Sequence, residues 1–257
     1  MNKAFGFGVA ATMVIGGAAS ADVLYDNPVG AGGTAANQEF GDFPTYSTYL
    51  VADFTVPDPG FTLTSVVAPM TVNGAWGGVT IARLHLFPKV GNLPDNITDD
   101  PSASMVVTVS FDVNTGVLTT VGLNLNVAAG DYWIGLTAIA GFGEFGSSFR
   151  LEGANDNGDP DAARNPGGSF NFPAGTNWFT IEGFDGWGFH DIALTVEGVP
   201  IQCPWDIDNN EVVGASDLLS LLASWGPCRG CPADFDRDGT VGASDLLTLL
   251  ANWGPCP

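Results

Sequence analysis

The chain has 257 residues, with 28 acidic against seven basic side chains and a formal net charge of −21. This acidity argues against nucleic acid and anionic membrane surfaces as partners, because both recruit basic patches, and it suits metal cations. It does not signal disorder here, because 45% of the residues are hydrophobic and 17 are Phe, enough to build a core.

Residues 1–21 are expected to form a signal peptide. One early positive charge, Lys3, precedes an uncharged apolar stretch that ends at Ala19-Ser20-Ala21, a small-x-small pattern typical of cleavage sites. The stretch is too short to span a bilayer, and no later stretch is long and apolar enough to be a transmembrane helix. A buried N-terminal helix is the alternative. We therefore expect a secreted or cell-surface protein whose mature chain starts near Asp22.

Residues 22–198 predict a β-rich domain. β-Branched and aromatic runs alternate with Gly, Pro, Asn and Asp, and no segment has a helical period. The triplets Asn114-Thr115-Gly116 and Ala129-Gly130-Asp131 have the composition of turns. About nine short strands at this spacing predict an antiparallel β-sandwich, with a jelly roll as the favoured topology. The predicted strands are 46–56, 61–67, 79–87, 105–113, 117–127, 132–140, 148–152, 178–183 and 192–196.

A catalytic site in this domain has little support. Two carboxylates would serve a glycosidase, and Glu144, Glu152 and Glu182 are candidates, but solvated surface carboxylates explain them better. A serine hydrolase is disfavoured because the chain has two histidines, His85 and His190, and lacks a Gly-x-Ser-x-Gly turn. His85 lies within an apolar strand, where a core position is expected.

Two further features of the domain have a binding and a structural interpretation. Trp133, Trp178 and Trp187 would suit a sugar-stacking face, although buried core aromatics are favoured. Residues 155–161 are rich in Asn and Asp and would suit a calcium ion, although a polar turn is favoured.

Residues 199–202 are expected to form a short linker to a second domain, residues 203–257. This domain contains a duplication, because residues 214–228 match residues 242–256 at 13 of 15 positions. The offset between the copies is 28 residues. Each copy consists of an acidic loop followed by an amphipathic helix, a repeated supersecondary unit.

Each acidic loop has the spacing of a twelve-residue calcium site. Calcium takes six to eight oxygen ligands, here from side chains at loop positions 1, 3, 5 and 12 and a carbonyl at position 7. Position 6 of such a loop requires a left-handed backbone. Gly239 permits this sharp turn in the second loop, whereas Glu211 occupies the position in the first. We therefore expect two sites, the second stronger, with a solvated acidic turn as the alternative. The predicted ligands are Asp206, Asp208, Asn210, Val212 and Asp217, and then Asp234, Asp236, Asp238, Thr240 and Asp245.

The helix after each loop carries an apolar stripe, which is expected to form the core of a two-helix module. The stripe comprises Leu218, Leu221, Leu222 and Trp225, repeated as Leu246, Leu249, Leu250 and Trp253.

Two tandem loop–helix calcium motifs, with Asp at position 12 and a Leu-Leu-x-Leu-Leu helix, resemble a type I dockerin over residues 203–257. The resemblance implies calcium-dependent docking onto a cohesin-like domain or cell-surface scaffold. In that family, such docking assembles secreted polysaccharide-degrading proteins. It also implies recognition through loop positions 10 and 11. These are Ala215 and Ser216 in the first repeat and Ala243 and Ser244 in the second.

All four cysteines, Cys203, Cys228, Cys231 and Cys256, fall in the last 55 residues and depart from the dockerin pattern. In an exported protein disulfides are favoured, although Cys228-x-x-Cys231 also has zinc spacing. The pseudo-twofold symmetry that the resemblance implies favours Cys203–Cys256 with Cys228–Cys231. The pairing of Cys203–Cys228 with Cys231–Cys256 stays open.

Together these features predict a secreted, non-catalytic β-sandwich protein displayed or assembled through a calcium-dependent dockerin-like domain. Polysaccharide binding or degradation is the expected setting, with carbohydrate as the candidate ligand of the sandwich. One alternative is a small polysaccharide hydrolase carrying the same domain. Another is a structural extracellular protein with no docking partner.

Overall fold

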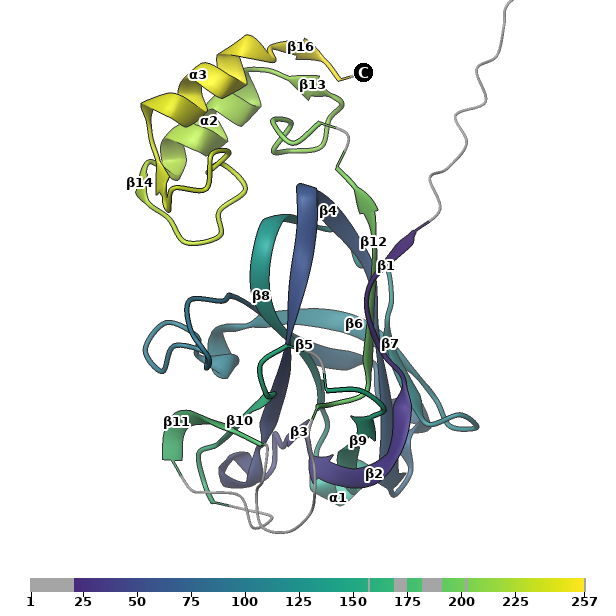
Figure 1. The fold of residues 1–257 in the computed structure, drawn as a ribbon. Coiled ribbons are helices and arrows are strands. Elements are labelled where there is room, and N and C mark those ends of the chain that lie inside the picture. Colours follow the sequence, from purple (N-terminus) through teal and green to yellow (C-terminus); the bar gives the residue numbers. More distant parts are fainter. Residues whose placement is uncertain (1–20, 157, 169–174, 182–190, 202, 257) are drawn as a thin grey trace, which may run out of the picture.

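The computed structural model describes residues 21–156, 158–168, 175–181, 191–201 and 203–256. Strands dominate these residues and the helices are few and short, so the protein is mainly β, as predicted. Residues 21–201, here the β region, are followed by residues 203–256, here the C-terminal region, which lies at one end of the β region (Figure 1). No helix of the described residues is long and apolar enough to cross a membrane. The expected signal peptide lies outside them, apart from Ala21.

The β region carries twelve of the described strands, one short helix and three 3-10 turns. The strands are β1 (Asp22–Asn27), β2 (Val29–Ala36), β3 (Gln38–Glu39), β4 (Tyr49–Asn73), β5 (Ile81–Pro88), β6 (Met105–Asp112), β7 (Val117–Thr120), β8 (Leu125–Ile139), β9 (Ser147–Gly153), β10 (Ala162–Asn165), β11 (Gly175–Thr180) and β12 (Leu194–Pro200). The helix is α1 (Phe142–Phe145), and the 3-10 turns are Pro44–Tyr46, Trp76–Gly78 and Pro101–Ala103.

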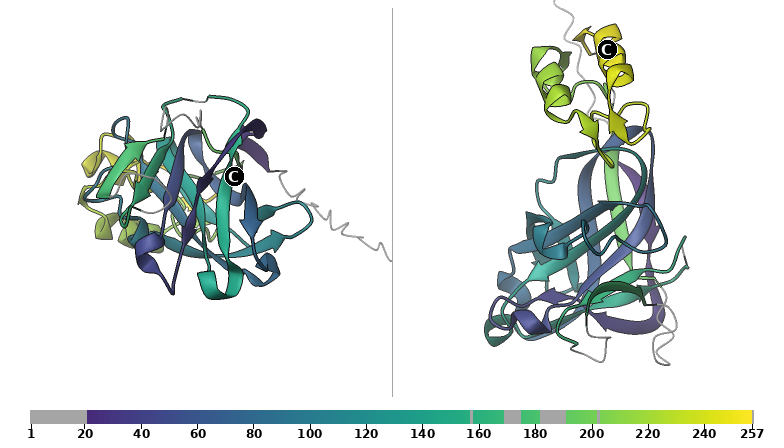
Figure 2. Two further views of the ribbon diagram at one scale, coloured as in Figure 1. Left: turned by 90° about the horizontal axis from the view of Figure 1, so that it is seen from below. Right: turned by 90° about the vertical axis from the view of Figure 1, so that its left-hand side faces the viewer.

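The strands follow the order β1-β12-β4-β7-β6-β5-β8-β3, and all neighbours pair antiparallel except β3 with β8. Strand β4 is the hub of the region, because it also pairs with β8, β9 and β10 as it curves through the fold (Figure 2). Sequence analysis predicted two strands where β4 is continuous. The polar segment between them is accommodated as an irregularity in the pairing with β8, between Val56 and Gly60.

A turn predicted near this irregularity is absent from the described structure. Ala129-Gly130-Asp131 lies inside β8, where Gly130 at φ 151° pairs with Val56. A positive φ is readily adopted by Gly, so the residue permits the strand to bend without ending it. The real break falls between β7 and β8, within the predicted strand 117–127. The turn around Asn114 and Gly116 is confirmed, whereas strands β1 and β2 were not predicted.

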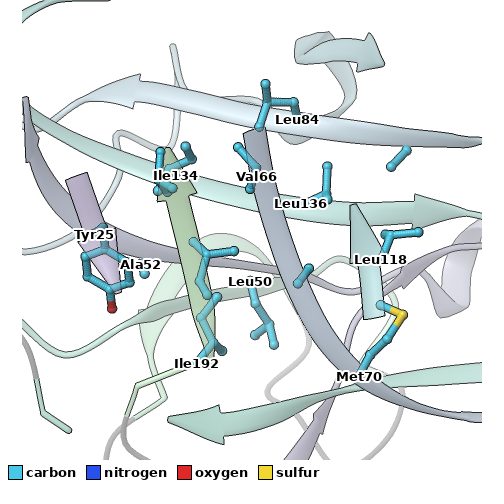
Figure 3. Packing of buried hydrophobic residues seen from close by; sticks show 14 of the residues in the cluster. Tyr25, Leu50, Ala52, Val66, Met70, Leu84, Leu118, Ile134, Leu136 and Ile192 are labelled. Atoms are coloured by element: carbon cyan, nitrogen blue, oxygen red, sulfur yellow. The ribbon is translucent and has the colours of Figure 1, made fainter. Parts of the chain in front are cut away.

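Buried aliphatic and aromatic side chains form the hydrophobic core of the β region (Figure 3). Leu50, Ile134 and Leu136 are fully buried. A second cluster contains Trp133 and Trp178, which are 0% and 3% exposed, so neither forms a sugar-stacking surface. The favoured core position of both residues is confirmed, and Trp187 lies outside the described residues.

His85 is a buried, hydrogen-bonded core residue, as predicted. Its Nδ1 lies 3.0 Å from Ser104 Oγ and its Nε2 3.0 Å from Thr137 Oγ1. Burial lowers the pKa of His85 to about 3, so the ring is neutral at physiological pH. A neutral ring satisfied by two hydroxyls accounts for the position without a catalytic role.

The link between the two regions is shorter than predicted. Strand β12 continues to Pro200, which pairs with Phe61 of β4, so Val199 and Pro200 belong to the β region. The C-terminal region therefore follows almost directly from a strand that is held on both sides.

Candidate calcium loops and docking face

The two sequence repeats fold as equivalent halves of the C-terminal region. Their helices are α2 (Ala215–Ala223) and α3 (Ala243–Ala251), and short strands pair each loop with the end of the other repeat. Strand β13 (Val212–Val213) pairs with β16 (Gly254–Pro255), with Val212 opposite Pro255. Strand β15 (Thr240–Val241) pairs with β14 (Gly226–Pro227), with Thr240 opposite Pro227. Because these pairings differ by the 28-residue offset, the halves are related by a pseudo-twofold exchange.

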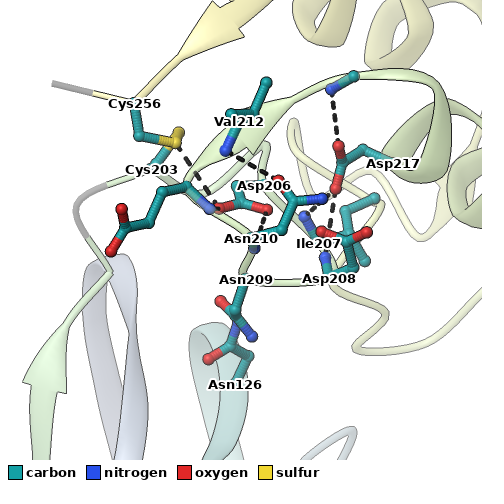
Figure 4. Close-up of a disulfide and its surroundings, with 12 residues drawn as sticks. Asn126, Cys203, Asp206, Ile207, Asp208, Asn209, Asn210, Val212, Asp217 and Cys256 are labelled. Atoms are coloured by element: carbon teal, nitrogen blue, oxygen red, sulfur yellow. Dashed lines mark hydrogen bonds between the residues drawn. A yellow bond between two sulfur atoms is a disulfide. The ribbon is translucent and has the colours of Figure 1, made fainter.

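The aspartate at loop position 12 organises each loop. Asp217 is fully buried, and its Oδ1 accepts the backbone N–H of Ile207 at 2.7 Å, while Oδ2 accepts that of Gly214 at 2.7 Å (Figure 4). In the second repeat, Asp245 accepts the N–H groups of Phe235 and Gly242 at 2.7 and 2.8 Å. These carboxylates therefore join the start of each loop to the N-terminus of its helix, where negative charge is favourable.

Three aspartates converge in each loop. Ligand oxygens of Asp206, Asp208 and Asp217 lie within 4.8 Å of one another, and those of Asp234, Asp236 and Asp245 do the same. The first aspartates are nearly buried, at 5% exposure for Asp206 and 4% for Asp234. Asp234 Oδ1 is buried and has no hydrogen-bond partner in the part of the chain that the structure describes. Such an oxygen fits a cation, because a buried carboxylate otherwise needs donors for its lone pairs.

The electrostatics of the loops depend on position. Burial raises the pKa of Asp206 and of Asp234. The Ser216 hydroxyl, as the largest contribution, lowers the pKa of Asp208, and Ser244 does the same for Asp236. Each loop thus combines a desolvated carboxylate with one that is kept ionised, a donor set that suits a hard divalent cation.

The predicted position-5 ligands lie outside the two triads of carboxylates. Asn210 Oδ1 accepts the N–H of Val212 at 3.0 Å, and Asp238 Oδ1 accepts that of Thr240 at 2.8 Å. These side chains are exposed and brace the loop segment whose position-7 carbonyls were predicted to bind the metal.

Position 6 has the left-handed backbone that was predicted. Gly239 has φ 85°, and Glu211 adopts φ 67° at the equivalent position. This conformation costs a non-glycine residue roughly 1 kcal/mol. The first loop therefore reaches its folded shape at a cost that the second avoids.

Glu211→Gly should consequently strengthen calcium binding at the first loop, by up to about fivefold if roughly 1 kcal/mol of strain is relieved. Calorimetric titration of the variant measures this affinity. Glu211→Ala is the matched control, because it removes the charge and keeps the Cβ, and it should leave most of the cost in place. A gain that is equal in the two variants would assign the effect to charge and contradict the strain argument.

Both cysteine pairs are disulfides, in the arrangement favoured above. Cys203 is bonded to Cys256 and Cys228 to Cys231, each with Cα atoms 5.7 Å apart. The alternative pairing and the zinc interpretation are therefore wrong. The first bond ties the segment before the first loop to the residue after β16, at the end of the second repeat (Figure 4). The second bond closes the short connection between the repeats.

Four of the eight residues that were predicted to form the helix core are exposed instead. Leu221 and Leu249 are fully buried, and Leu218 and Leu246 pack against the same small core. The other members of the stripe are about half exposed, because two nine-residue helices and two loops cannot enclose both sides of each helix. Together with two leucines that the stripe did not include, they form an exposed set, here the Leu–Trp face. It comprises Leu219, Leu222, Trp225, Leu247, Leu250 and Trp253, with exposures from 47% to 68%.

The residues predicted for partner recognition lie at the first turn of each helix. Ala215 and Ala243 are exposed, as are Ser216 and Ser244. The serine hydroxyls also lower the pKa of the position-3 aspartates, so a partner that contacts these serines would contact side chains that interact with the loops.

The two candidate glutamates of the β region that the structure describes, Glu144 and Glu152, differ in burial. Glu144 is exposed in α1, whereas Glu152 is buried, which corrects its expected solvation, and accepts the N–H of Gly33 at 2.6 Å. Glu182 and His190 lie outside the described residues, as does Asn157 of the acidic segment 155–161. Within that segment, Asp159 forms an ion pair with Lys89 at 2.8 Å.

No protein-family model matches the chain, and no curated protein matches it.

Proposed function

We propose that residues 203–257 form a dockerin-like calcium-dependent docking domain carried by a secreted β-sandwich protein, in which the sandwich has a jelly-roll topology. The observation that carries the proposal is the duplicated aspartate triad, in which Asp234 keeps a buried oxygen without a hydrogen-bond donor. Asp206, Asp208, Asp217, Asp234, Asp236 and Asp245 would hold two calcium ions. Bound calcium would neutralise the crowded carboxylates and fix both loops at the starts of α2 and α3.

The Leu–Trp face supports a docking role. Each repeat exposes three large apolar side chains on a small, strongly acidic region, and exposed apolar side chains grouped in this way favour contact with a partner. Its two halves are equivalent under the repeat, and each adjoins the predicted recognition pair of its helix, such as Ala215 and Ser216. The proposed partner is a cohesin-like domain or cell-surface scaffold.

For the β region we propose a non-catalytic role in polysaccharide binding or degradation. Glu152 is buried and accepts the N–H of Gly33, which gives it a structural role, and Glu144 is exposed, as expected of a solvated carboxylate. Both described residues are therefore accounted for without catalysis. The two disulfides suit an exported protein.

Calorimetric titration of the full chain with calcium tests the metal sites. Two binding events of unequal strength are expected, the stronger one being lost in Asp234→Asn, since an amide replaces one charged ligand. Glu144→Ala removes one exposed carboxylate from the β region and should bind calcium like the parent chain. No binding at millimolar calcium would overturn the proposal.

Docking is tested separately, by measuring the binding of the full chain to recombinant type I cohesin domains on a biosensor surface. We expect binding in calcium, loss of binding in EDTA, and loss on Leu222→Asp combined with Leu250→Asp. A chain that binds two calcium ions and none of the cohesins would favour the structural alternative.

A further inference from the structure

Both candidate calcium loops contact the β region through the same loop position. Asn209 and Arg237, 28 residues apart, stand at position 4 of the two loops. Asn209 Oδ1 accepts from Nδ2 of Asn126 in β8 at 2.7 Å, and the Arg237 guanidinium pairs with Asp58 in β4. Both loop residues have a positive φ, 58° and 60°, so these contacts depend on the loop backbone.

The connection between the repeats makes a third contact. Arg229, between the cysteines of the short disulfide, donates from Nη2 to Asp99 Oδ1 at 2.9 Å. Beside it, Gly230 packs so closely on Pro88 that a Cβ would not fit. Arg229 and Arg237 are the two basic residues of 203–257, and both pair with carboxylates of the β region.

The first aspartate of each triad lines the space between the regions. A cleft of about 190 Å³ is bounded by Asp206 and Asp234 on one side and by Asp58 and Asn126 on the other. The metal loops and the interface therefore share residues and lie within one cleft, and a change in loop shape would alter the contacts across it.

Charge makes this arrangement sensitive to the metal. Residues 203–257 hold eight acidic and two basic side chains, a formal charge of 2 − 8 = −6, and they face an acidic β region. Two calcium ions would reduce the charge to −2. Without them, the convergent carboxylates repel one another within each loop, and the two regions repel each other.

We propose that calcium loading latches the C-terminal region onto the β region through Asn209, Arg229 and Arg237, an inference that rests on the proposed calcium sites. Helices α2 and α3 lie on the side of the loops away from the β region (Figures 1 and 2), and the side chains of the Leu–Trp face are exposed, so the latched state holds this face in one fixed orientation. Calcium then sets the direction of docking in addition to folding the loops.

The test disrupts the latch from the β-region side, where no metal ligand is touched. Asp58→Ala with Asn126→Ala removes both partners of the position-4 residues. Asp112→Ala with Asn114→Ala is the matched control, because these exposed residues bond to each other within the β6–β7 turn. Each full-length protein is studied by small-angle X-ray scattering and by calcium calorimetry, in calcium and in excess EDTA.

The parent chain and the control should be compact in calcium and should expand in EDTA. The latch variant should be expanded in both conditions and should bind calcium about fivefold more weakly, because coupling between docking and metal binding is reciprocal. Calcium binding with no change in the parent chain's scattering would overturn the latch and leave the calcium sites intact. An absence of calcium binding would instead overturn the proposed function, and the latch with it.

Discussion

Asp245→Ala should abolish the second calcium site and destabilise the C-terminal region by about 3 kcal/mol or more, even in EDTA. The carboxylate is fully buried and accepts backbone N–H groups from Phe235, Asp236 and Gly242. Each buried donor left without an acceptor costs about 1–3 kcal/mol. Amide hydrogen exchange of α3, measured with and without calcium, reports the stability loss, and calorimetry reports the lost site.

Asp238→Ala separates the structural role of Asp245 from metal binding. Asp238 is exposed and accepts one N–H, that of Thr240, so its removal should cost less than about 1 kcal/mol in EDTA while still weakening calcium binding. Equal loss of α3 protection in the two variants without metal would contradict the structural role given to Asp245.

The candidate site was largely predictable because its information is local. A twelve-residue loop places its ligands by spacing alone, so the sequence predicted the residues that converge, together with the left-handed backbone at Glu211. The spacing did not predict that the position-5 side chains of Asn210 and Asp238 also accept N–H groups of their own loops. These hydrogen bonds depend on the folded shape of each loop, which spacing does not describe.

The features that the sequence did not predict depend on long-range packing. Whether Leu222 and Trp225 are buried is decided by what lies against α2, and the periodicity of one helix carries no such information. Likewise, β4 passes through its polar segment because β8 bends with it around Gly130. One indication in the sequence pointed to a role of Arg229 and Arg237 at the interface, namely that basic residues are rare in this acidic chain.

Removal of the Cys203–Cys256 disulfide should destabilise the C-terminal region by about 4 kcal/mol, against about 2 kcal/mol for Cys228–Cys231. The first bond closes a separation of 53 residues and the second a separation of three, and the entropy lost by the unfolded chain grows with loop length. Double alanine variants of each pair, compared by hydrogen exchange of α2 and α3, measure both costs.

The two disulfides should also differ in their effect on calcium. Cys203 precedes the first loop, and Cys256 donates its N–H to the carbonyl of Glu211 at 2.9 Å, so the long-range bond fixes the loop whose backbone is strained. Its loss should weaken the first site more than the second, whereas loss of the short bond should release Arg229 from Asp99 and loosen the contact with the β region. Equal weakening of both calcium sites by the two variants would mean that the disulfides stabilise the region as a whole and do not act on individual loops.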